Sequence, residues 1–190
     1  ATTFDFGFAL GPRINAAGRL ADMTLGIECL LTDDASRAAE LAATLDGINR
    51  ERREIEGGMR EQAMLMAESL FDESEEPPPA ISVFDPDFHE GVVGIVASRI
   101  KDKLHRPTFV FAASSAPGKE HELKGSGRSI PGFHLRDALD LVAKRHPGVI
   151  LKFGGHAMAA GCTVAEESFD VFEQAFAQVA QEWLDAATLT

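Results

Sequence analysis

Two glycine-rich stretches contain the residues whose types and spacing are best suited to binding an anion. The first is F-G-G-H at 153–156, where Gly154 and Gly155 leave the backbone uncovered and His156 adds one directional donor or acceptor. The second is K-G-S-G-R-S at 124–129, where glycines alternate with cations and hydroxyls. Uncovered backbone N–H groups beside a planar guanidinium are typical of phosphate sites. We therefore expect both stretches to hold a phosphate or a sugar.

Within the second stretch we expect Ser126, Arg128 and Ser129 to contact phosphate, with Lys124 as a further candidate. The spacing lacks the G-x-x-x-x-G-K-[ST] pattern of nucleotide-hydrolysing loops, and no G-x-S-x-G elbow occurs in the chain. Hydrolysis by either of those routes is therefore not predicted. The alternatives stay open: a hairpin turn with surface charges here, and a plain glycine turn with a hydrogen-bonded histidine at F-G-G-H.

Arg13 and Arg19 lie in a stretch at 7–20 that mixes glycine, proline, asparagine and alanine. Their guanidinium groups have the fork shape that suits a phosphate. A helix-entry loop with two solvated arginines explains the same residues equally well.

The sequence D-P-D-F-H-E at 85–90 contains residue types that bind hard metal ions. The favoured interpretation is different, because carboxylates just before a helix beginning near Val92 would cap its free N–H groups. We therefore predict no metal site in this chain. His89 is kept as a further candidate for contacting phosphate.

The composition suits one buried core in a reducing compartment. The chain has 190 residues, is 45% apolar and carries a net charge of −12, which disfavours nucleic acid as a partner. The segment 77–163 nevertheless has 11 Lys/Arg and 8 Asp/Glu, a balance of +3 that allows a local phosphate-binding surface. Cys29 and Cys162 are expected to be buried free thiols in the cytoplasm. We expect no membrane span or signal segment, and a chain without a starting methionine suggests a fragment.

The elements that position these residues divide the chain into an N-terminal helical part and a C-terminal α/β part. A helix is predicted over 35–71, with T-D-D at 32–34 as its N-cap and a bend or break at Gly47 or at Gly57 and Gly58. Its length and charge favour a connector between two bodies. The acidic and proline-rich run at 72–79 is expected to end it as a stiff spacer.

After this run the pattern alternates between strands and helices. This alternation predicts an α/β fold, a mixed β-sheet with helices on its faces, preceded by the long connector helix. The run 149–153 is apolar and is expected to be a buried strand, and an aromatic stripe from Phe169 to Trp183 is expected to pack in the core. The strands are predicted at 80–84, 107–112, 122–126, 149–153 and 159–164, and the helices at 25–31, 92–104, 135–144 and from about 168 onward.

Several stretches, taken in order, resemble the bacterial RecJ family of single-strand-specific exonucleases, part of the DHH phosphoesterase superfamily. They are G-P-R-I-N-A-A-G-R-L at 11–20, the arginine-rich helix, H-E-G-V-V-G-I-V-A-S-R at 89–99, K-G-S-G-R-S-I-P-G-F-H-L at 124–135 and F-G-G-H-A-M-A-A-G at 153–161. Together they cover nearly the whole chain. The F-G-G-H form favours RecJ over the branch that degrades short oligonucleotides and cyclic dinucleotides, where G-G-G-H is common.

The resemblance implies a domain organisation. Residues 1–34 would be the end of a DHH catalytic domain, 35–76 the connector helix and linker, and 77–190 a DHH-associated substrate-binding domain. The family holds its substrate between the two domains. Arg13 and Arg19 would then face the substrate from the catalytic side, and the serines and Arg128 of 126–129 would hold phosphate near the 5′ end. Gly154, Gly155 and His156 would contact the phosphate or sugar of the terminal nucleotide.

The resemblance also implies what this chain lacks. The family binds two Mn²⁺ or Mg²⁺ ions on aspartate and histidine ligands, and no D-H-D or D-H-H motif occurs here. We therefore expect a fragment that binds single-stranded DNA and has no catalytic residues or bound metal of its own. It would depend on the N-terminal DHH domain of its parent protein. We expect that parent to be monomeric and cytoplasmic and to serve DNA repair and recombination. The alternatives are a phosphodiesterase for short oligonucleotides or cyclic dinucleotides, and a non-catalytic nucleic-acid-binding module like the related domain of alanyl-tRNA synthetases.

Overall fold

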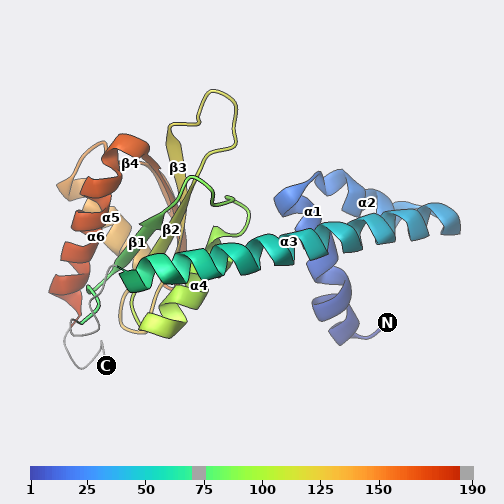
Figure 1. Cartoon of the computed structure of the whole chain (residues 1–190), viewed down its shortest axis with the longest axis horizontal. Coiled ribbons are helices and arrows are strands. Elements are labelled where there is room, and N and C mark those ends of the chain that lie inside the picture. The colour runs from blue at the N-terminus through green and yellow to red at the C-terminus, as the bar shows by residue number, and fades with distance from the viewer. Residues whose placement is uncertain (70–75, 185–190) are drawn as a thin grey trace. The chain divides into compact units, whose positions relative to one another are not determined.

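The computed structural model describes residues 1–69 and 76–184 and divides the chain into two compact units, Ala1–Gly58 and Met59–Thr190. Figure 1 shows the helices and strands that are named below. No helix within the described ranges is both long enough and apolar enough to cross a bilayer.

The first unit is helical. A short π-helix, η1 (Asp5–Leu10), is followed by α1 (Gly11–Leu20), α2 (Met23–Leu31) and the first part of α3 (Ala35–Ser69). The residues at 11–20 therefore form a helix, and the alternative of a helix-entry loop is wrong. The N-cap predicted for α3 is confirmed, because Asp34 Oδ1 accepts hydrogen bonds from the backbone N–H groups of Ser36 and Arg37.

Helix α3 is continuous from Ala35 to Ser69, so the break expected at its glycines is not found. No atom lies within 4 Å of the position that a Cβ would occupy at Gly47, Gly57 or Gly58, so nothing crowds the helix there. Each glycine costs about 1 kcal/mol relative to alanine, and a helix of this length absorbs that cost. The helical prediction for residues 70 and 71 and the first half of the boundary predicted at 72–79 fall outside the described residues.

The second unit is built on a five-stranded mixed sheet, which confirms the α/β prediction. The strand order is β1-β2-β3-β5-β4, with β1 parallel to β2 and the other neighbours antiparallel. The strands are β1 (Ile81–Phe84), β2 (Thr108–Ala113), β3 (Glu122–Arg128), β4 (Ile150–Gly155) and β5 (Ala159–Ala165). The helices are α4 (Val93–Leu104), α5 (Leu135–Arg145) and α6 (Phe169–Trp183), the last preceded by the short η2 (Glu166–Ser168).

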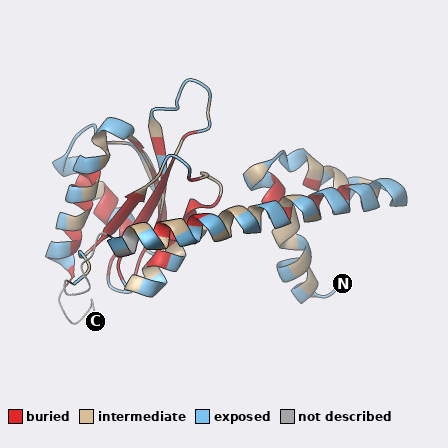
Figure 2. Cartoon of the chain, in the orientation of Figure 1, coloured by how far each residue is buried: buried red, intermediate tan, exposed pale blue. Residues whose placement is uncertain are grey.

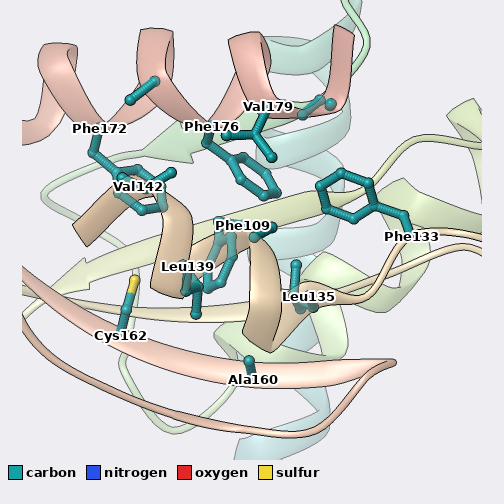
Figure 3. Close-up of a cluster of buried hydrophobic side chains, with 14 of the residues drawn as sticks. Phe109, Phe133, Leu135, Leu139, Val142, Ala160, Cys162, Phe172, Phe176 and Val179 are labelled. Carbon is teal, nitrogen blue, oxygen red and sulfur yellow. The ribbon is translucent and has the colours of Figure 1, made fainter. Parts of the chain in front are cut away.

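The main core lies between one face of this sheet and helices α5 and α6. Phe109 in β2 makes edge-on ring contacts with Phe172 and Phe176 of α6, and all three are fully buried. Figure 3 shows these rings together with Leu139 and Val142 of α5. The core role predicted for the aromatic stripe is thus confirmed, although Trp183 at the end of α6 remains 40% exposed.

Strand β4 corrects one prediction. The run 149–153 was expected to be buried, but β5 lies between β3 and β4, so β4 has a neighbour on one side only. Leu151 is 52% exposed, and none of the residues of β4 is buried (Figure 2). An apolar run is compatible with an edge strand as well as with a central one, and only the strand order separates the two.

Candidate functional site

Strand β3 contains most of the K-G-S-G-R-S stretch, and its residues alternate between the two faces of the sheet. A Cβ at Gly125 would lie 2.4 Å from the Phe111 ring, and one at Gly127 would lie 2.5 Å from the Phe109 ring. These two glycines therefore face the core, where they make room for aromatic rings. Because side chains alternate along a strand, Lys124, Ser126 and Arg128 face the other side. The hairpin-turn alternative for this stretch is wrong, since it is an extended strand at the centre of the sheet.

The register of the strands extends this second face from β3 across β5 to β4. Residues paired directly across antiparallel strands point to the same side. We call this surface the open face, and its rows are Arg128 with Ala159, Ser126 with Gly161 and Gly154, and Lys124 with Thr163 and Lys152. The open face thus brings residues from both predicted stretches into adjacent positions.

The middle of the open face is made of backbone rather than side chains. Gly154 is exposed, and a Cβ there would meet no atom within 4 Å. A Cβ at Gly161 would meet only the carbonyl oxygen of Gly125, at an ordinary 3.5 Å. A ligand can therefore approach the sheet backbone closely, with Ser126 and Arg128 on one side and Lys152 on the other.

The hairpin between β4 and β5 carries His156. Gly155 has a φ of +139°, and a Cβ there would lie 2.5 Å from the Cα of Ala160, so this position requires glycine. The backbone N–H of His156 donates to the carbonyl of Ala159 and closes the turn. The His156 residue itself is exposed at the tip.

Two backbone hydrogen bonds hold the tip of this hairpin against the segment that follows β3. The N–H of Ser129 donates to the carbonyl of Met158 at 2.9 Å, and the N–H of Leu135 donates to the carbonyl of Ala157 at 2.8 Å. The F-G-G-H turn and the end of K-G-S-G-R-S are therefore fixed side by side by the main chain.

Ser129 is buried, unlike Lys124, Ser126 and Arg128 of the same stretch, which are exposed or half-buried. It is 1% exposed, and its hydroxyl donates to the carbonyl of Phe133 at 2.6 Å. In this structure the Ser129 side chain holds the turn at 129–133, so a role in contacting phosphate would have to come from its neighbours.

Two buried serines give contrasting predictions for stability. The hydroxyl of Ser82 in β1 is buried without a hydrogen-bond partner in the described part of the chain, whereas that of Ser129 is bonded. We expect Ser82→Ala to leave the free energy of unfolding unchanged or raise it by up to about 1 kcal/mol. Ser129→Ala should lower it by about 1–3 kcal/mol, because the Phe133 carbonyl loses its donor. Urea unfolding of both variants measures the difference, and equal midpoints would contradict it.

The guanidinium of Arg128 lies over the first turn of α4. A Cβ on Gly94 would be 2.8 Å from Arg128 Nη2 and 3.5 Å from the Cβ of Ser126. Arg128 Nη1 also donates to the carbonyl of Gly127. The positive charge of Arg128 is therefore next to the amino end of a helix that has no side-chain cap, and both features favour an anion at this place.

The loop at 85–90 has a different role from the one predicted. Its acidic residues do not cap α4, whose N-cap Val92 receives no side-chain hydrogen bond. Asp85 instead accepts from Gln62 of α3 and from the backbone of Asp87, and His89 Nδ1 accepts from the N–H of Gly91. Among the residues that the structure describes, no group of three or more His, Cys, Asp or Glu side chains could hold a metal ion.

Arg13 and Arg19 belong to the first unit, on α1. Arg13 Nε donates to Asp46 Oδ1 of α3 at 2.8 Å and its Nη1 donates to the carbonyl of Ala9, so this guanidinium ties the helices of the first unit together. Arg19 is exposed at the end of α1. Whether either residue contacts phosphate stays a prediction.

Lys152 is a basic residue of the open face that the sequence analysis missed. It is exposed, and it precedes Gly154 by two positions in β4. The alternation of side chains along a strand could have identified it, because residues two apart share a face.

Comparisons with known proteins agree with this fold. Residues 77–182 match the DHHA1 domain. The chain belongs to the DHHA1 domain family. The match covers all five strands of the sheet, helices α4 and α5, and α6 as far as residue 182. It therefore includes every residue of the open face.

RecJ proteins of bacteria are similar to the DHHA1 chain over nearly its full length. The single-stranded-DNA-specific exonuclease RecJ of Dickeya dadantii is 53% identical over 97% of this chain. The chain spans 31% of the length of that relative. The crystal structure of RecJ in complex with Mg²⁺ from Thermus thermophilus matches 95% of this chain and 26% of its own, with 33% identity and a TM-score of 0.79. A structure of the same protein in complex with Mn²⁺ matches equally well, over 25% of its own chain.

Proposed function

We propose that this chain is the DNA-binding part of a RecJ-like 5′→3′ single-stranded-DNA exonuclease that serves repair and recombination in the bacterial cytoplasm. The observation that carries the proposal is the open face of the DHHA1 domain. It combines uncovered backbone at Gly154 and Gly161 with the cations Arg128 and Lys152, in a chain similar to RecJ over nearly all of its length.

Each part of the open face has a stated role in this proposal. Arg128 and Ser126 bind a phosphate beside the amino end of α4, where the guanidinium supplies two parallel donors. Gly154 and Gly161 let the sugar–phosphate backbone lie directly on the sheet. His156, at the exposed tip of the hairpin, contacts the phosphate or sugar of the terminal nucleotide. Of the two further candidates, His89 is kept for phosphate, whereas Lys124 is paired with Glu90 and is given no phosphate contact in this proposal.

The same proposal assigns the domains. Residues 1–34 are the end of a DHH domain and residues 77–190 are the substrate-binding domain. Residues 35–76 are the connector helix and linker between them. Two Mn²⁺ or Mg²⁺ ions belong to the DHH domain of the parent. The residues of this chain do not fit such ions, because it has no D-H-D or D-H-H motif and the described ranges contain no ligand cluster. This chain therefore binds and orients the DNA strand and does not cut it.

Binding of a labelled single-stranded DNA oligonucleotide at several salt concentrations tests the proposal. We expect Arg128→Ala to weaken binding about tenfold at low salt and to reduce the slope of log K against log[salt] by about 0.7, the value for one phosphate contact on a single strand. His156→Ala should weaken it severalfold. Lys144→Ala is the matched control, because this exposed lysine lies on α5, on the opposite side of the sheet, and pairs with Asp140.

Several outcomes of this experiment would contradict the proposal. Wild-type affinity in both Arg128→Ala and His156→Ala would do so, as would Mn²⁺-dependent degradation of 5′-labelled single strands by the pure chain. Equal retention of RNA would favour a non-catalytic nucleic-acid-binding module. In the full-length parent, the same two substitutions should lower exonuclease activity without unfolding the protein, and a preference of that parent for dinucleotides would favour the short-oligonucleotide phosphodiesterases.

A further inference from the structure

Two lysines occupy equivalent positions on the open face. Lys124 in β3 and Lys152 in β4 are both paired with Thr163 of β5, one on each side, so they belong to the same row. Both residues are exposed. By position alone, they would be equally good contacts for a phosphate backbone crossing the sheet.

The two lysines differ in whether they form an ion pair. Lys124 Nζ lies 3.6 Å from Glu90 Oε2. Within the described ranges, no ion pair or hydrogen bond of the Lys152 side chain is recorded. One of two equivalent cations is therefore neutralised by a carboxylate and the other is not.

Glu90 is well fixed in this position. Its Oε1 accepts from the hydroxyl of Ser115 at 2.8 Å and its Oε2 from the backbone N–H of Ser115 at 3.3 Å. Partial burial raises the pKa of this carboxyl, but the Ser115 hydrogen bonds and the Lys124 ammonium together outweigh burial, so that its pKa lies below its ordinary value. The carboxylate is thus ionised at neutral pH and faces Lys124.

The loop that carries Glu90 is itself held by helix α3. Gln62 Nε2 donates to Asp85 Oδ2 at 3.0 Å, and the backbone N–H of His89 donates to the sulfur of Met59. Met59 is buried. Both Asp85 and His89 of the loop are anchored to α3. Moving the Glu90 carboxylate away from Lys124 would therefore require breaking these contacts.

We propose that Glu90 is a positioning residue that withdraws Lys124 from the DNA backbone, so that the bound strand crosses the sheet by way of Arg128, the glycines Gly161 of β5 and Gly154 of β4, and Lys152. This inference rests on the proposed function. A lysine that binds a phosphate releases the cations condensed on the DNA at that phosphate, whereas a lysine held by a carboxylate makes no such contact and releases none. Glu90 thereby directs the strand toward the β4 edge and away from the loop between β2 and β3.

The salt dependence of single-stranded DNA binding tests this inference, because a merely structural role for Glu90 would not change it selectively. We expect Lys152→Ala to reduce the slope of log K against log[salt] by about 0.7, and Lys124→Ala to leave it nearly unchanged. Glu90→Gln keeps an oxygen acceptor for Ser115 but removes the charge. Lys124 is then able to bind a phosphate, so the slope should become steeper by about 0.7. Adding Lys124→Ala to Glu90→Gln should return it to the wild-type value.

Equal losses for Lys124→Ala and Lys152→Ala would overturn the inference, as would an unchanged slope in a folded Glu90→Gln variant. If Glu90→Gln does not fold, the comparison of the two lysine variants decides alone. Arg128→Ala separates the two proposals. Binding that depends on Arg128 without the expected difference between the lysines overturns only the role of Glu90. Absence of binding by the wild-type chain overturns the proposed function and this inference with it.

Discussion

Gly125→Ala is expected to lower the free energy of unfolding of the second unit by about 1–3 kcal/mol. The new Cβ would lie 2.4 Å from the Phe111 ring, a separation that forces the ring to move. Phe111 is fully buried and packs edge-on against Phe169 and Phe172, so it has no free space to enter. Trp183 is the only tryptophan of the chain and contacts Phe133 in this unit, so its fluorescence in urea reports the unfolding.

Gly154→Ala is the matched control for this prediction. It makes the same chemical change two strands away in the same sheet, where a Cβ would meet no atom within 4 Å. We expect its unfolding midpoint to equal or slightly exceed that of the wild type, since alanine restricts the unfolded chain more than glycine does. Similar midpoints for Gly125→Ala and Gly154→Ala would contradict the packing of the aromatic rings described above.

Gly154→Val is expected to weaken binding of single-stranded DNA about tenfold or more, the equivalent of about 1.4 kcal/mol. The branched side chain would rise from the centre of the open face, where we propose that the sugar–phosphate backbone lies. The substitution should not destabilise the fold, because the space above Gly154 is empty and valine suits a strand. The measurement is a binding titration at fixed salt together with urea unfolding.

A graded series sharpens this second prediction. Gly154→Ala should lose part of the affinity and Gly154→Val most of it, while the unfolding midpoints of both stay at or above that of the wild type. Full affinity in a folded Gly154→Val variant would show that the strand does not cross the middle of the open face.

The fold was largely predictable because its signals are local. The spacing of apolar residues identified α4, α5 and α6 and all five strands, and Asp34 marked the start of α3. The burial of β4 was predicted wrongly because it depends on strand order. No local pattern around Leu151 reveals that β5 lies between β3 and β4. The helix likewise continues through Gly57 and Gly58, and the cost of a glycine alone does not decide between a continuous and a broken helix.

The candidate site was only partly predictable, because the glycines that marked it in the sequence have more than one structural role. Glycine next to charge drew attention to 124–129, yet Gly125 and Gly127 make room for the rings of Phe111 and Phe109 on the other side of the strand. Sequence spacing also could not separate the buried Ser129 from the half-buried Ser126 and Arg128 before it. The pairing of Glu90 with Lys124 joins residues 34 positions apart, and only the three-dimensional arrangement brings them together.

The two amide hydrogen bonds that fix the β4–β5 turn have a kinetic consequence. Because Ser129 and Leu135 already immobilise the turn in the free protein, little conformational entropy would remain to be lost in the DNA binding that we propose. Association should then proceed in a single fast phase whose rate is set by electrostatic attraction, without a slower rearrangement after encounter. Affinity differences among variants of this surface should consequently appear mainly in how long the strand stays bound.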